Sequence, residues 1–494
     1  MSASAAMKLF EKAISLDEAQ QMEFASKIDI IIDTFPPKFI STEFYPFLTT
    51  WIPKNNLKIV RILADKVNKM ISVNESVVAF APVLETILSS ENQEISKRIK
   101  ANLKSVTLGG DALGFFKKLV SSPIDYVRAF CAQILFLLQP IEDKVVICQS
   151  LICDPAFKVR FSLAGIIATL PVDLANNVAK AFCSDSSSRI KAFLPVVCAP
   201  LPFFFSSVVP ALISDHDWYI RASIAKEVCR AKDIATAINV AYPLTEDSVW
   251  QVVLSALTSF TQIIKENPNV PFENGPRMLD NLFRTLLYPQ ASTKNASIDA
   301  FFALNARYQF DSANIMNFVE EVITRQPPTT RLHFLQQLCA LRLESIIALI
   351  TDKIHAVVVS LMSSEQWRIR LGVVCALSSL ATLNRDPNVR TKFSELCLQS
   401  LDDESTPVRT AAAEELLQCY RASNPSQLFP DCYYTLKGSD SFRKRQAALI
   451  ILQNIGKSCQ PAEVAQVKAE MQSFLKDKCD NVVNMANKFI SELP

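Results

Sequence analysis

The chain has 494 residues, of which 49% are hydrophobic, so it can bury a large core and is not expected to be disordered. Glycine is scarce, at 8 residues, which argues against sheet-rich folds with tight hairpins and against glycine-rich phosphate loops. Lys and Arg (51) nearly balance Asp and Glu (49). The net charge of +2 lacks the basic excess typical of proteins that bind nucleic acid or anionic lipid.

The N-terminal sequence MSASAAMKLFEK has no hydrophobic segment of the secretory-signal type. The 13 cysteines are scattered without paired spacing, and most lie in apolar runs, for example Cys131, Cys229 and Cys375. Such thiols are expected to be small buried groups in a reducing compartment. We therefore expect a cytoplasmic protein, with the nucleus as a second location.

Two segments of the N-terminal half need a separate interpretation. The run GGDALG (109–114) lacks the lysine and the Ser/Thr of a phosphate-binding loop, and we predict a turn between helices there. Residues 193–214 carry no charge and are about long enough to span a bilayer. Four prolines interrupt this segment, and an interior proline costs a helix about 3 kcal/mol. We therefore predict two buried helices that meet at a proline-rich turn.

A pattern recurs along the chain. An acidic residue is followed five positions later by a β-branched aliphatic residue, the anchor, which Arg or Lys follows directly, and alanine often comes five positions after the anchor. The clearest copies begin at Asp154, Asp215 and Asp403. The anchors lie near positions 22, 60, 97, 127, 159, 190, 220, 252, 330, 369, 408, 444 and 482. The gap between 252 and 330 predicts one more copy near 292.

The spacing indicates about fourteen repeats, of two antiparallel helices each, and the tetratricopeptide pattern is absent. We expect the acid to cap the second helix, the anchor and the alanine to be buried, and the basic residue to reach the acid of a neighbouring repeat. No repeat can bury its apolar face alone, so the repeats must stack. The arginines expected to form this ladder are Arg128, Arg160, Arg221, Arg370 and Arg409, and the ladder is interrupted at Val253 and Val483.

The sequence therefore predicts an all-α fold, an α-solenoid of the HEAT/armadillo type with about 14 antiparallel helix pairs. We expect residues 1–494 to form a single solenoid. The steps between anchors 97 and 252 are about 30 residues, which is short for a HEAT repeat and implies short helices or tight links.

Two stretches, SDHDWYIRASIAKEV (214–228) and SSEQWRIRLGVVCALSSLA (363–381), resemble the Trp-containing repeats of the scaffold (A) subunit of protein phosphatase 2A. They fall at the seventh and eleventh repeats, as in that family, and residues 467–493 are similar to its terminal repeat. The resemblance implies a non-catalytic scaffold without a cofactor, a metal or a small-molecule substrate. Residues 1–250 would bind a regulatory subunit, and residues 251–494 would bind the phosphatase catalytic subunit. Neither nucleic acid nor a membrane is an expected partner.

Carried over by position, the resemblance assigns partner contacts to the turns that join paired helices. The residues expected to meet the catalytic subunit are Gln366, Trp367, Arg368, Ser405, Thr406, Pro407, Phe442, Arg443 and Asn481. The residues expected to face a regulatory subunit are Asp125, Tyr126, Phe157, Lys158, His216, Asp217, Trp218 and Tyr219.

The chain also departs from that family. It has about fourteen repeats where the family has fifteen, and in the fifth repeat Arg160 is followed by Phe161, where the family has a second arginine. A tryptophan at a helix start usually packs against its own repeat, but Trp and Arg are also the residues most enriched at interface hot spots. We expect Trp218 and Trp367 to be interface residues, and Trp51 and Trp250 to be core residues.

No catalytic constellation is evident. His216, His333 and His355 are far apart in the sequence, and no cysteine pairs have zinc-ligand spacing. The alternative function is an importin-β-like nuclear transport receptor, although such chains are strongly acidic, or another HEAT-repeat scaffold for protein interactions. An enzyme built on a helical toroid, a membrane-coat protein and a chromosome-organising protein are further alternatives.

Overall fold

The computed structural model describes residues 3–72, 77–108, 110–269, 272–423 and 428–493. These residues form helices and connecting turns, and none of those described lies in a strand, which confirms the predicted all-α class. The chain divides into two compact units, Met1–Ser259 and Phe260–Pro494, called here the N-terminal and the C-terminal unit.

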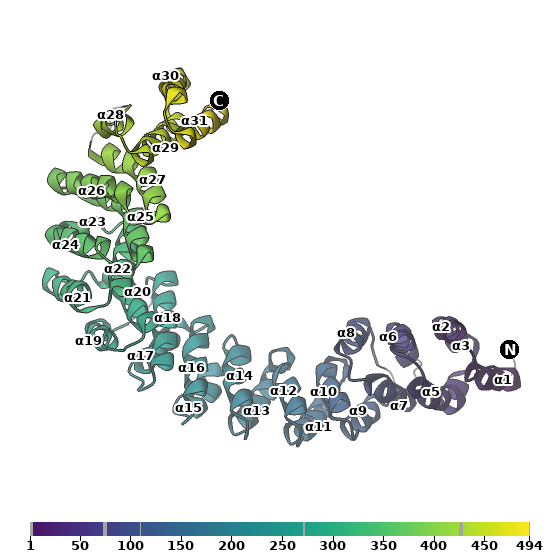
Figure 1. Cartoon of the computed structure of the whole chain (residues 1–494). Helices are drawn as coiled ribbons and strands as arrows, with labels where there is room; N and C mark the ends of the chain where they lie inside the picture. Colours follow the sequence, from purple (N-terminus) through teal and green to yellow (C-terminus); the bar gives the residue numbers. More distant parts are fainter. Residues whose placement is uncertain (1–2, 73–76, 109, 270–271, 424–427, 494) are drawn as a thin grey trace. The chain divides into compact units, whose positions relative to one another are not determined.

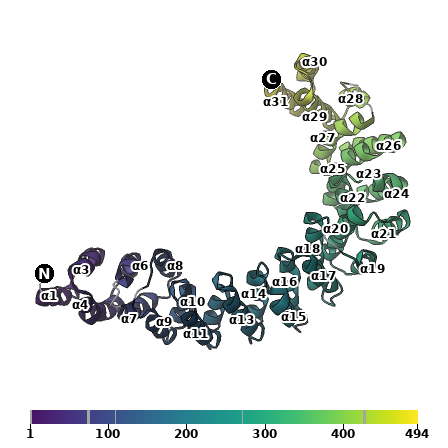
Figure 2. The same cartoon turned by 180° about the vertical axis from the view of Figure 1, so that it is seen from behind.

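In the N-terminal unit, the first and second helices of the repeats form two rows (Figures 1 and 2). Consecutive members of a row pack against each other, for example α10 against α12 and α9 against α11. The first helices are α1 (Ala3–Ala13), α5 (Tyr45–Trp51), α7 (Val77–Leu88), α9 (Ala112–Val120), α11 (Ile141–Ile152), α13 (Val172–Cys183), α15 (Val209–Leu212) and α17 (Ile234–Leu244). The second helices are α2 (Glu18–Ser26), α6 (Leu57–Ile71), α8 (Gln93–Leu103), α10 (Asp125–Gln133), α12 (Phe157–Ala164), α14 (Ser188–Cys198), α16 (Trp218–Glu227) and the start of α18 (Trp250–Glu266). Short helices α3 (Ile28–Thr34) and α4 (Pro37–Phe39) lie between α2 and α5.

The C-terminal unit has the same two-row arrangement (Figure 1). Its first helices are α19 (Gly275–Thr285), α21 (Ser312–Arg325), α24 (Thr351–Met362), α26 (Pro387–Gln399), α28 (Asp431–Lys437) and α30 (Pro461–Gln472), with the short α23 (Glu344–Leu349) before α24. Its second helices are α20 (Ala291–Tyr308), α22 (Pro328–Ala340), α25 (Trp367–Leu383), α27 (Thr406–Ser423), α29 (Phe442–Ser458) and α31 (Asp480–Glu492).

Polar side chains fix where several of these helices begin. The Asn56 carboxamide accepts from the N–H groups of Lys58 (3.0 Å) and Ile59 (3.3 Å) at the start of α6. Asp311 accepts from the N–H of Asn314 (2.7 Å) at the start of α21. A cap of this kind contributes about 1 kcal/mol because it satisfies N–H groups that have no partner within the helix.

The predicted repeat accounts for the core. Each of fourteen second helices in the described chain contains one of the expected anchor positions, including α20, which begins next to position 292. In the clearest copies the anchors are fully buried, and the alanines five positions later are equally enclosed. These anchors are Val159, Ile220 and Val408, and the alanines are Ala164, Ala225 and Ala413.

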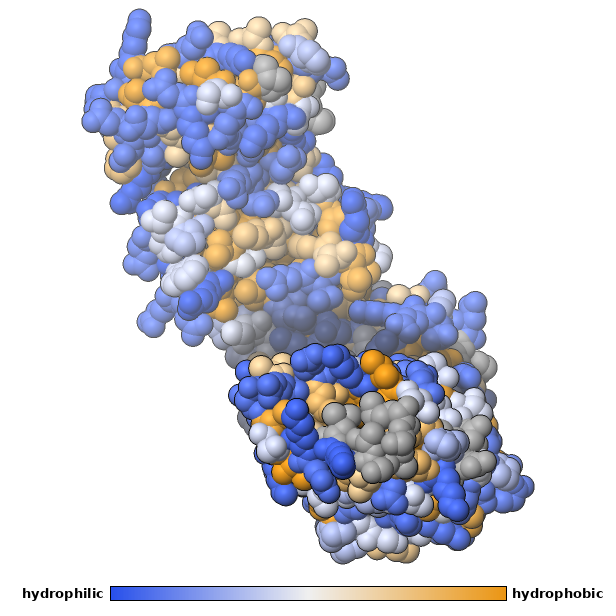
Figure 3. Space-filling view, turned by 90° about the vertical axis from the view of Figure 1, so that its right-hand side faces the viewer, coloured by the Kyte–Doolittle hydropathy of each residue, from blue (hydrophilic) through white to orange (hydrophobic). Residues whose placement is uncertain are grey.

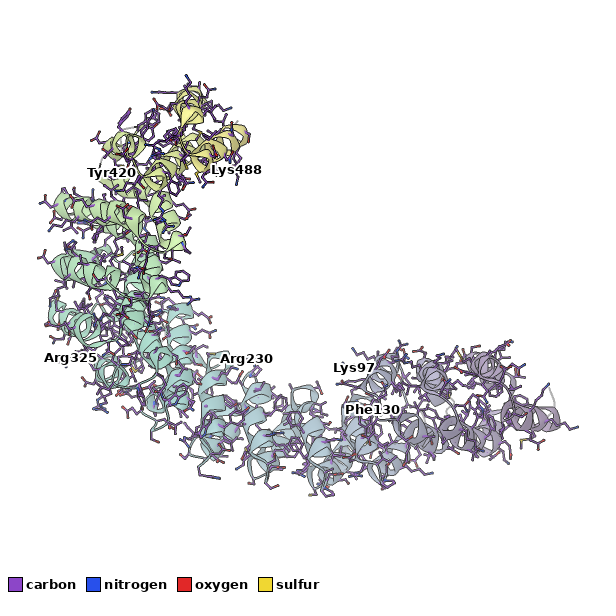
Figure 4. The ribbon with its side chains drawn as sticks, viewed as in Figure 1. Lys97, Phe130, Arg230, Arg325, Tyr420 and Lys488 are labelled. Atoms are coloured by element: carbon purple, nitrogen blue, oxygen red, sulfur yellow. The ribbon has the colours of Figure 1, made fainter. Side chains whose placement is uncertain are left out.

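The anchors predicted near 97 and 292 were displaced by one or two residues from the buried positions. Lys97 is exposed on the side of α8 away from the first helices (Figure 4), and the core positions of that helix are Ile95 and Ile99. In α20 the first buried residue is Thr293, next to the predicted position 292. These copies lack a β-branched aliphatic residue at the anchor, so the sequence does not mark the buried position.

The proline-rich segment forms short buried helices, as predicted. Pro195 lies inside α14, and the chain then passes Pro200 and Pro202 before α15 begins at Val209. No helix among the residues described is both long and apolar enough to cross a membrane.

In the GGDALG run, Gly110 and Asp111 lie in the predicted turn and Ala112 begins α9, whereas Gly109 lies outside the described residues. Gly110 has a φ of 60°, which favours glycine, and Asp111 caps α9 by accepting from the N–H of Gly114 (2.7 Å).

Several expectations of burial were wrong. Trp51 is in the core, but Trp250 is only half-buried, because it is the first residue of α18 and occupies the same kind of position as Trp218 and Trp367. Cys375 is exposed, although its neighbours in the apolar run are buried, because it lies on the same side of α25 as the exposed Arg368 and Thr382.

Candidate protein-binding surfaces

The turns between paired helices are held by a ladder of charged groups. In the N-terminal unit, Arg128 donates from Nε and Nη2 to the two carboxylate oxygens of Asp154, at 2.6 and 3.1 Å. Asp154 also accepts from the N–H of Ala156 at 2.8 Å. The Asp154 side chain therefore shapes its own turn and accepts from the preceding repeat at the same time.

The same arrangement recurs from repeat to repeat, which confirms the predicted ladder. In the N-terminal unit the further pairs are Arg160–Asp185, Lys191–Asp215 and Arg221–Asp247. In the C-terminal unit they are Arg370–Asp403 and Arg445–Asp477. Each acid accepts from the N–H two positions later, just before or at the helix start, rather than from the first turn of the helix as predicted.

The prediction that Arg409 belongs to the ladder was wrong. Its Nη1 donates to the carbonyl oxygens of Asp403 (2.6 Å) and Glu404 (2.8 Å), and no carboxylate of the next repeat pairs with it among the described residues. The reason is that Ser439 stands where the other ladder arginines find an aspartate, and its hydroxyl accepts from the N–H of Ser441. Arg445 is a ladder member that the sequence analysis did not name.

The ladder changes the ionisation of its acids. Hydrogen bonds from Arg445 hold the pKa of Asp477 below its ordinary value, although burial opposes this. Burial also opposes ionisation of Asp403, but hydrogen bonds from Arg370 and from the Ser405 N–H outweigh it and lower its pKa. Both carboxylates are therefore charged at neutral pH.

In the C-terminal unit, the predicted contact residues lie at the starts of α25, α27, α29 and α31. Consecutive members of this series pack together, so the helix starts follow one edge of the unit. Gln366 is the N-cap of α25, and the Arg368 guanidinium lies over the Trp367 ring at 4.8 Å from its centroid. Trp367 and Ser405 are half-buried, whereas the other residues of the set are exposed: Gln366, Arg368, Thr406, Pro407, Phe442, Arg443 and Asn481.

Three of these residues share a groove of about 210 Å³ between α27 and α29, namely Thr406, Phe442 and Arg443. The Arg443 guanidinium lies 5.8 Å from the centroid of the Phe442 ring. The structure therefore places two Arg–aromatic pairs along this edge, an arrangement that suits an interface.

In the N-terminal unit, the predicted residues fall into two groups. Tyr126, Phe157 and Lys158 line a groove of about 210 Å³ between α10 and α12. Asp125 begins α10, and its carboxylate is 4.0 Å from Lys158 Nζ. His216 and Asp217 form the turn before α16, where the Asp217 carboxylate accepts from the N–H of Tyr219 (3.0 Å).

Trp218 and Tyr219 belong to a larger groove of about 760 Å³, which crosses α12, α14, α16 and α18. They are 40% and 53% exposed, which is unusual for aromatic side chains of this size. The two grooves share Phe161, whose ring packs against Phe157 (centroids 5.4 Å apart) and against Phe193 (4.7 Å). The second helices of this unit thus carry a continuous aromatic surface. This surface is called the aromatic groove, and it consists of the larger groove together with the smaller groove that shares Phe161 with it.

Sequence reasoning missed Phe193, Arg189 and Lys226 in this groove, and treated Phe161 only as a departure from a family pattern. These residues precede or follow the buried anchors by one to six positions, on the side of the second helix that the first helices leave uncovered. An aromatic residue at a position expected to be polar was the available signal.

On the face drawn in Figure 3, coloured residues are mostly hydrophilic, and hydrophobic ones form smaller patches.

No group of three or more His, Cys, Asp or Glu side chains that could hold a metal occurs among the described residues. The histidines are dispersed, and His333 Nε2 lies 2.9 Å from the Asp299 carboxylate.

No protein-family model and no curated protein matches this sequence. Solved structures do match. The structure of Kap121p aligns with a TM-score of 0.54 at 14% identity, covering 99% of this chain and 53% of that one. The fold is that of a HEAT-type α-solenoid.

Two further structures are similar to this solenoid. Kap121p bound to Pho4p aligns with a TM-score of 0.50 at 15% identity, covering 99% of this chain and 53% of that one. The karyopherin Kap121p bound to the extreme C-terminus of the protein phosphatase Cdc14p also has a TM-score of 0.50, at 15% identity, with 96% and 53% covered. The chain thus spans about half the length of these karyopherin chains. The comparisons give no support to the phosphatase 2A scaffold in particular.

Proposed function

We propose that this chain is a non-catalytic, protein-binding solenoid of the transport-receptor type, which holds a polypeptide cargo in the aromatic groove of its N-terminal unit. The observation that carries the proposal is the exposure of Trp218, Tyr219 and Phe161 along one groove of about 760 Å³. Large aromatic side chains bury much apolar area at low entropic cost, so they serve as anchors at protein interfaces.

The rigidity of the surrounding turns supports this function. The ladder pairs Arg160–Asp185 and Arg221–Asp247 lie in the same repeats as the groove, and their side chains are largely buried. A surface that is already ordered loses less conformational entropy when a ligand binds. The groove is therefore prepared to receive a flexible segment of another protein.

The comparisons support the proposal at the level of the fold. Kap121p has been solved with Pho4p and with the extreme C-terminus of Cdc14p, so a solenoid of this fold holds polypeptides in those cases. A transport receptor would move between cytoplasm and nucleus, which agrees with the location expected from the sequence.

Direct binding tests the proposal. The purified chain is titrated with phenylalanine-glycine repeat peptides and with the small GTPase of nuclear transport. Binding of both is expected. If neither binds at tens of micromolar, the transport-receptor function is wrong, and a HEAT solenoid with other protein partners remains.

A second candidate function is the scaffold of a phosphatase 2A-type enzyme. It is favoured by the edge of the C-terminal unit, where Arg368 stacks on Trp367 and Arg443 approaches Phe442. The partners would be a catalytic subunit at this edge and a regulatory subunit at the N-terminal turns. Mixing the chain with a purified phosphatase catalytic subunit separates the two functions, since only the scaffold would form a complex that survives gel filtration.

A further inference from the structure

The aromatic groove has a distinctive charge. Arg189 and Lys226 line it, both are exposed, and the described structure gives neither of them an ion pair. The carboxylate that lines the groove, Glu227, is buried, and its Oε2 accepts from Nη1 of Arg230 (2.7 Å; Arg230 is labelled in Figure 4). The charges left available to a ligand in the groove are therefore positive.

Two further acidic side chains, Asp215 and Asp217, lie near the groove, but neither of them lines it. The Asp215 carboxylate pairs with Lys191 (2.8 Å), and the Asp217 carboxylate accepts from the N–H of Tyr219. At the far end, the smaller groove adds the exposed Lys158, which is only loosely paired with Asp125 at 4.0 Å. The unpaired positive charges thus lie in the larger groove, at Arg189 and Lys226.

The length of the aromatic groove determines how long a bound peptide segment can be. Apart from Ser96 on α8, the residues that line the two grooves lie on five consecutive second helices, from Tyr126 on α10 to Gln251 on α18. Helices packed about 8–10 Å apart give a length of about 35 Å. About ten residues of extended chain, at about 3.3 Å each, span this distance.

We propose that the aromatic groove binds an extended acidic segment of about ten residues, whose apolar side chains pack on Phe161, Phe193 and Trp218 and whose carboxylates pair with Arg189 and Lys226. This inference rests on the proposed function and specifies the chemistry of the cargo. A basic segment would place like charges together in a groove whose lining carboxylate, Glu227, is already paired with Arg230.

Single-stranded nucleic acid is the other class of ligand that combines negative charge with stacking. Affinity for nucleic acid depends on many cations that follow the phosphates. The 760 Å³ groove offers two such cations, and the chain has a net charge of only +2. The observations therefore favour the polypeptide.

The test is selection from a phage-displayed library with ten randomised positions on the full chain. We expect enrichment of Asp and Glu together with Phe, Leu or Trp. The selected peptides are then measured by fluorescence polarisation against the charge-reversed variant R189E/K226E and the groove variant F161A/F193A. Both variants should weaken binding at least tenfold.

Matched controls lie outside the groove. Lys97→Glu reverses an exposed charge on α8, and Phe136→Ala removes a ring that is 40% exposed but does not line the aromatic groove. Both should leave affinity within twofold, and circular dichroism checks that every variant is folded. The R189E/K226E variant, put through the same selection, should switch its preference to basic peptides.

Three results would overturn the inference: enrichment of basic peptides on the unchanged chain, no enrichment at all, or affinity that the groove variants do not alter. A ten-nucleotide oligothymidylate that binds more tightly than the selected peptides would overturn it as well. Binding of basic peptides in the groove would leave the transport-receptor function intact, whereas failure to bind the transport GTPase would leave the peptide chemistry intact. The two proposals can therefore fail separately.

Discussion

Arg370 and Asp403 form a two-pronged pair, in which Nε donates to Oδ2 at 2.7 Å and Nη2 donates to Oδ1 at 3.0 Å. The two side chains are 8% and 10% exposed, so the pair joins α25 to the turn before α27 in a largely dry environment. A third contact, from Nη1 to the carbonyl oxygen of Ser364 (2.7 Å), ties the same guanidinium to the turn of its own repeat. One side chain thus links two successive turns.

Removing this guanidinium should destabilise the C-terminal unit. Arg370→Met leaves the Asp403 carboxylate buried without its main partner, and breaking a buried pair in this way costs about 3–5 kcal/mol. Hydrogen exchange of the α25 and α27 amides measures the loss locally, which suits a repeat array that need not unfold in one step. Arg368→Met, two residues earlier and exposed, is the control and should change stability by no more than about 0.5 kcal/mol.

Arg409 has no carboxylate partner in the ladder, so supplying one should stabilise the C-terminal unit rather than destabilise it. Ser439→Asp should place a carboxylate where Arg409 now finds only carbonyl oxygens and the Thr406 hydroxyl. We expect a gain of about 1 kcal/mol in the stability of α27 and α29, because the new hydrogen bonds are charge-assisted. Urea unfolding followed by hydrogen exchange checks this, and an unchanged or lower stability would show that the serine turn cannot adopt the geometry of the aspartate turns.

The lowered pKa of Asp477 predicts a dependence of stability on pH. An unfolded aspartate has a pKa of about 3.9. The stabilisation that Arg445 gives is therefore fully present above about pH 4 and is lost as the pH falls through the lower folded pKa. Asp477→Asn should reduce the melting temperature at pH 7 and have much less effect at pH 2.5. Equal shifts at the two pH values would mean that the carboxylate's charge is not what stabilises the turn.

Substitutions of a core residue and of a surface residue of α16 should differ clearly in their effect on the free energy of unfolding. Ile220 is fully buried, and Ile220→Ala should cost about 2–5 kcal/mol through lost burial and the cavity left behind. The adjacent Tyr219 is 53% exposed, so Tyr219→Ala should cost less than about 0.5 kcal/mol while weakening ligand binding. Thermal unfolding of the two variants is the measurement. A comparable loss of stability for Tyr219→Ala would place it in the fold rather than in an interface.

The turn at Trp367 and Arg368 tests the second candidate function. If the chain is a phosphatase scaffold, the double substitution to alanine should weaken binding of the catalytic subunit by about 2–4 kcal/mol. The array itself should stay folded, because neither side chain is part of the buried core. Surface plasmon resonance gives the affinity, and full binding by the double variant would remove this turn from the interface.

The sequence predicted the repeat well because its signal is local. An acid, an aliphatic anchor and a basic residue within seven positions define both the turn and the buried face, so the second helices and most ladder pairs could be placed. The ladder pair predicted for Arg409 was wrong for the same local reason, because Ser439 takes the place of the acid one repeat later. Where the anchor is not aliphatic, as at Lys97, the pattern gives the helix but not its register.

The aromatic groove could not be predicted in this way. Phe161, Phe193 and Trp218 belong to three different repeats, and only the stacking of α12, α14 and α16 brings them to one groove. Their exposure depends on the first helices leaving that side open, which no single repeat reveals. The turn residues of the C-terminal unit, carried over from a family resemblance, remain a prediction about binding, although most of them are exposed.

The central claim is that another polypeptide occupies the aromatic groove, and photo-crosslinking in the native cells tests it most directly. Benzoylphenylalanine is placed at Phe193 in the groove and, as a control, at Phe136 outside it, and the crosslinked segments are identified by mass spectrometry. We expect a defined protein partner crosslinked through an acidic segment at position 193 and no such adduct at position 136. Adducts of equal yield at the two positions, or none at position 193, would contradict the claim.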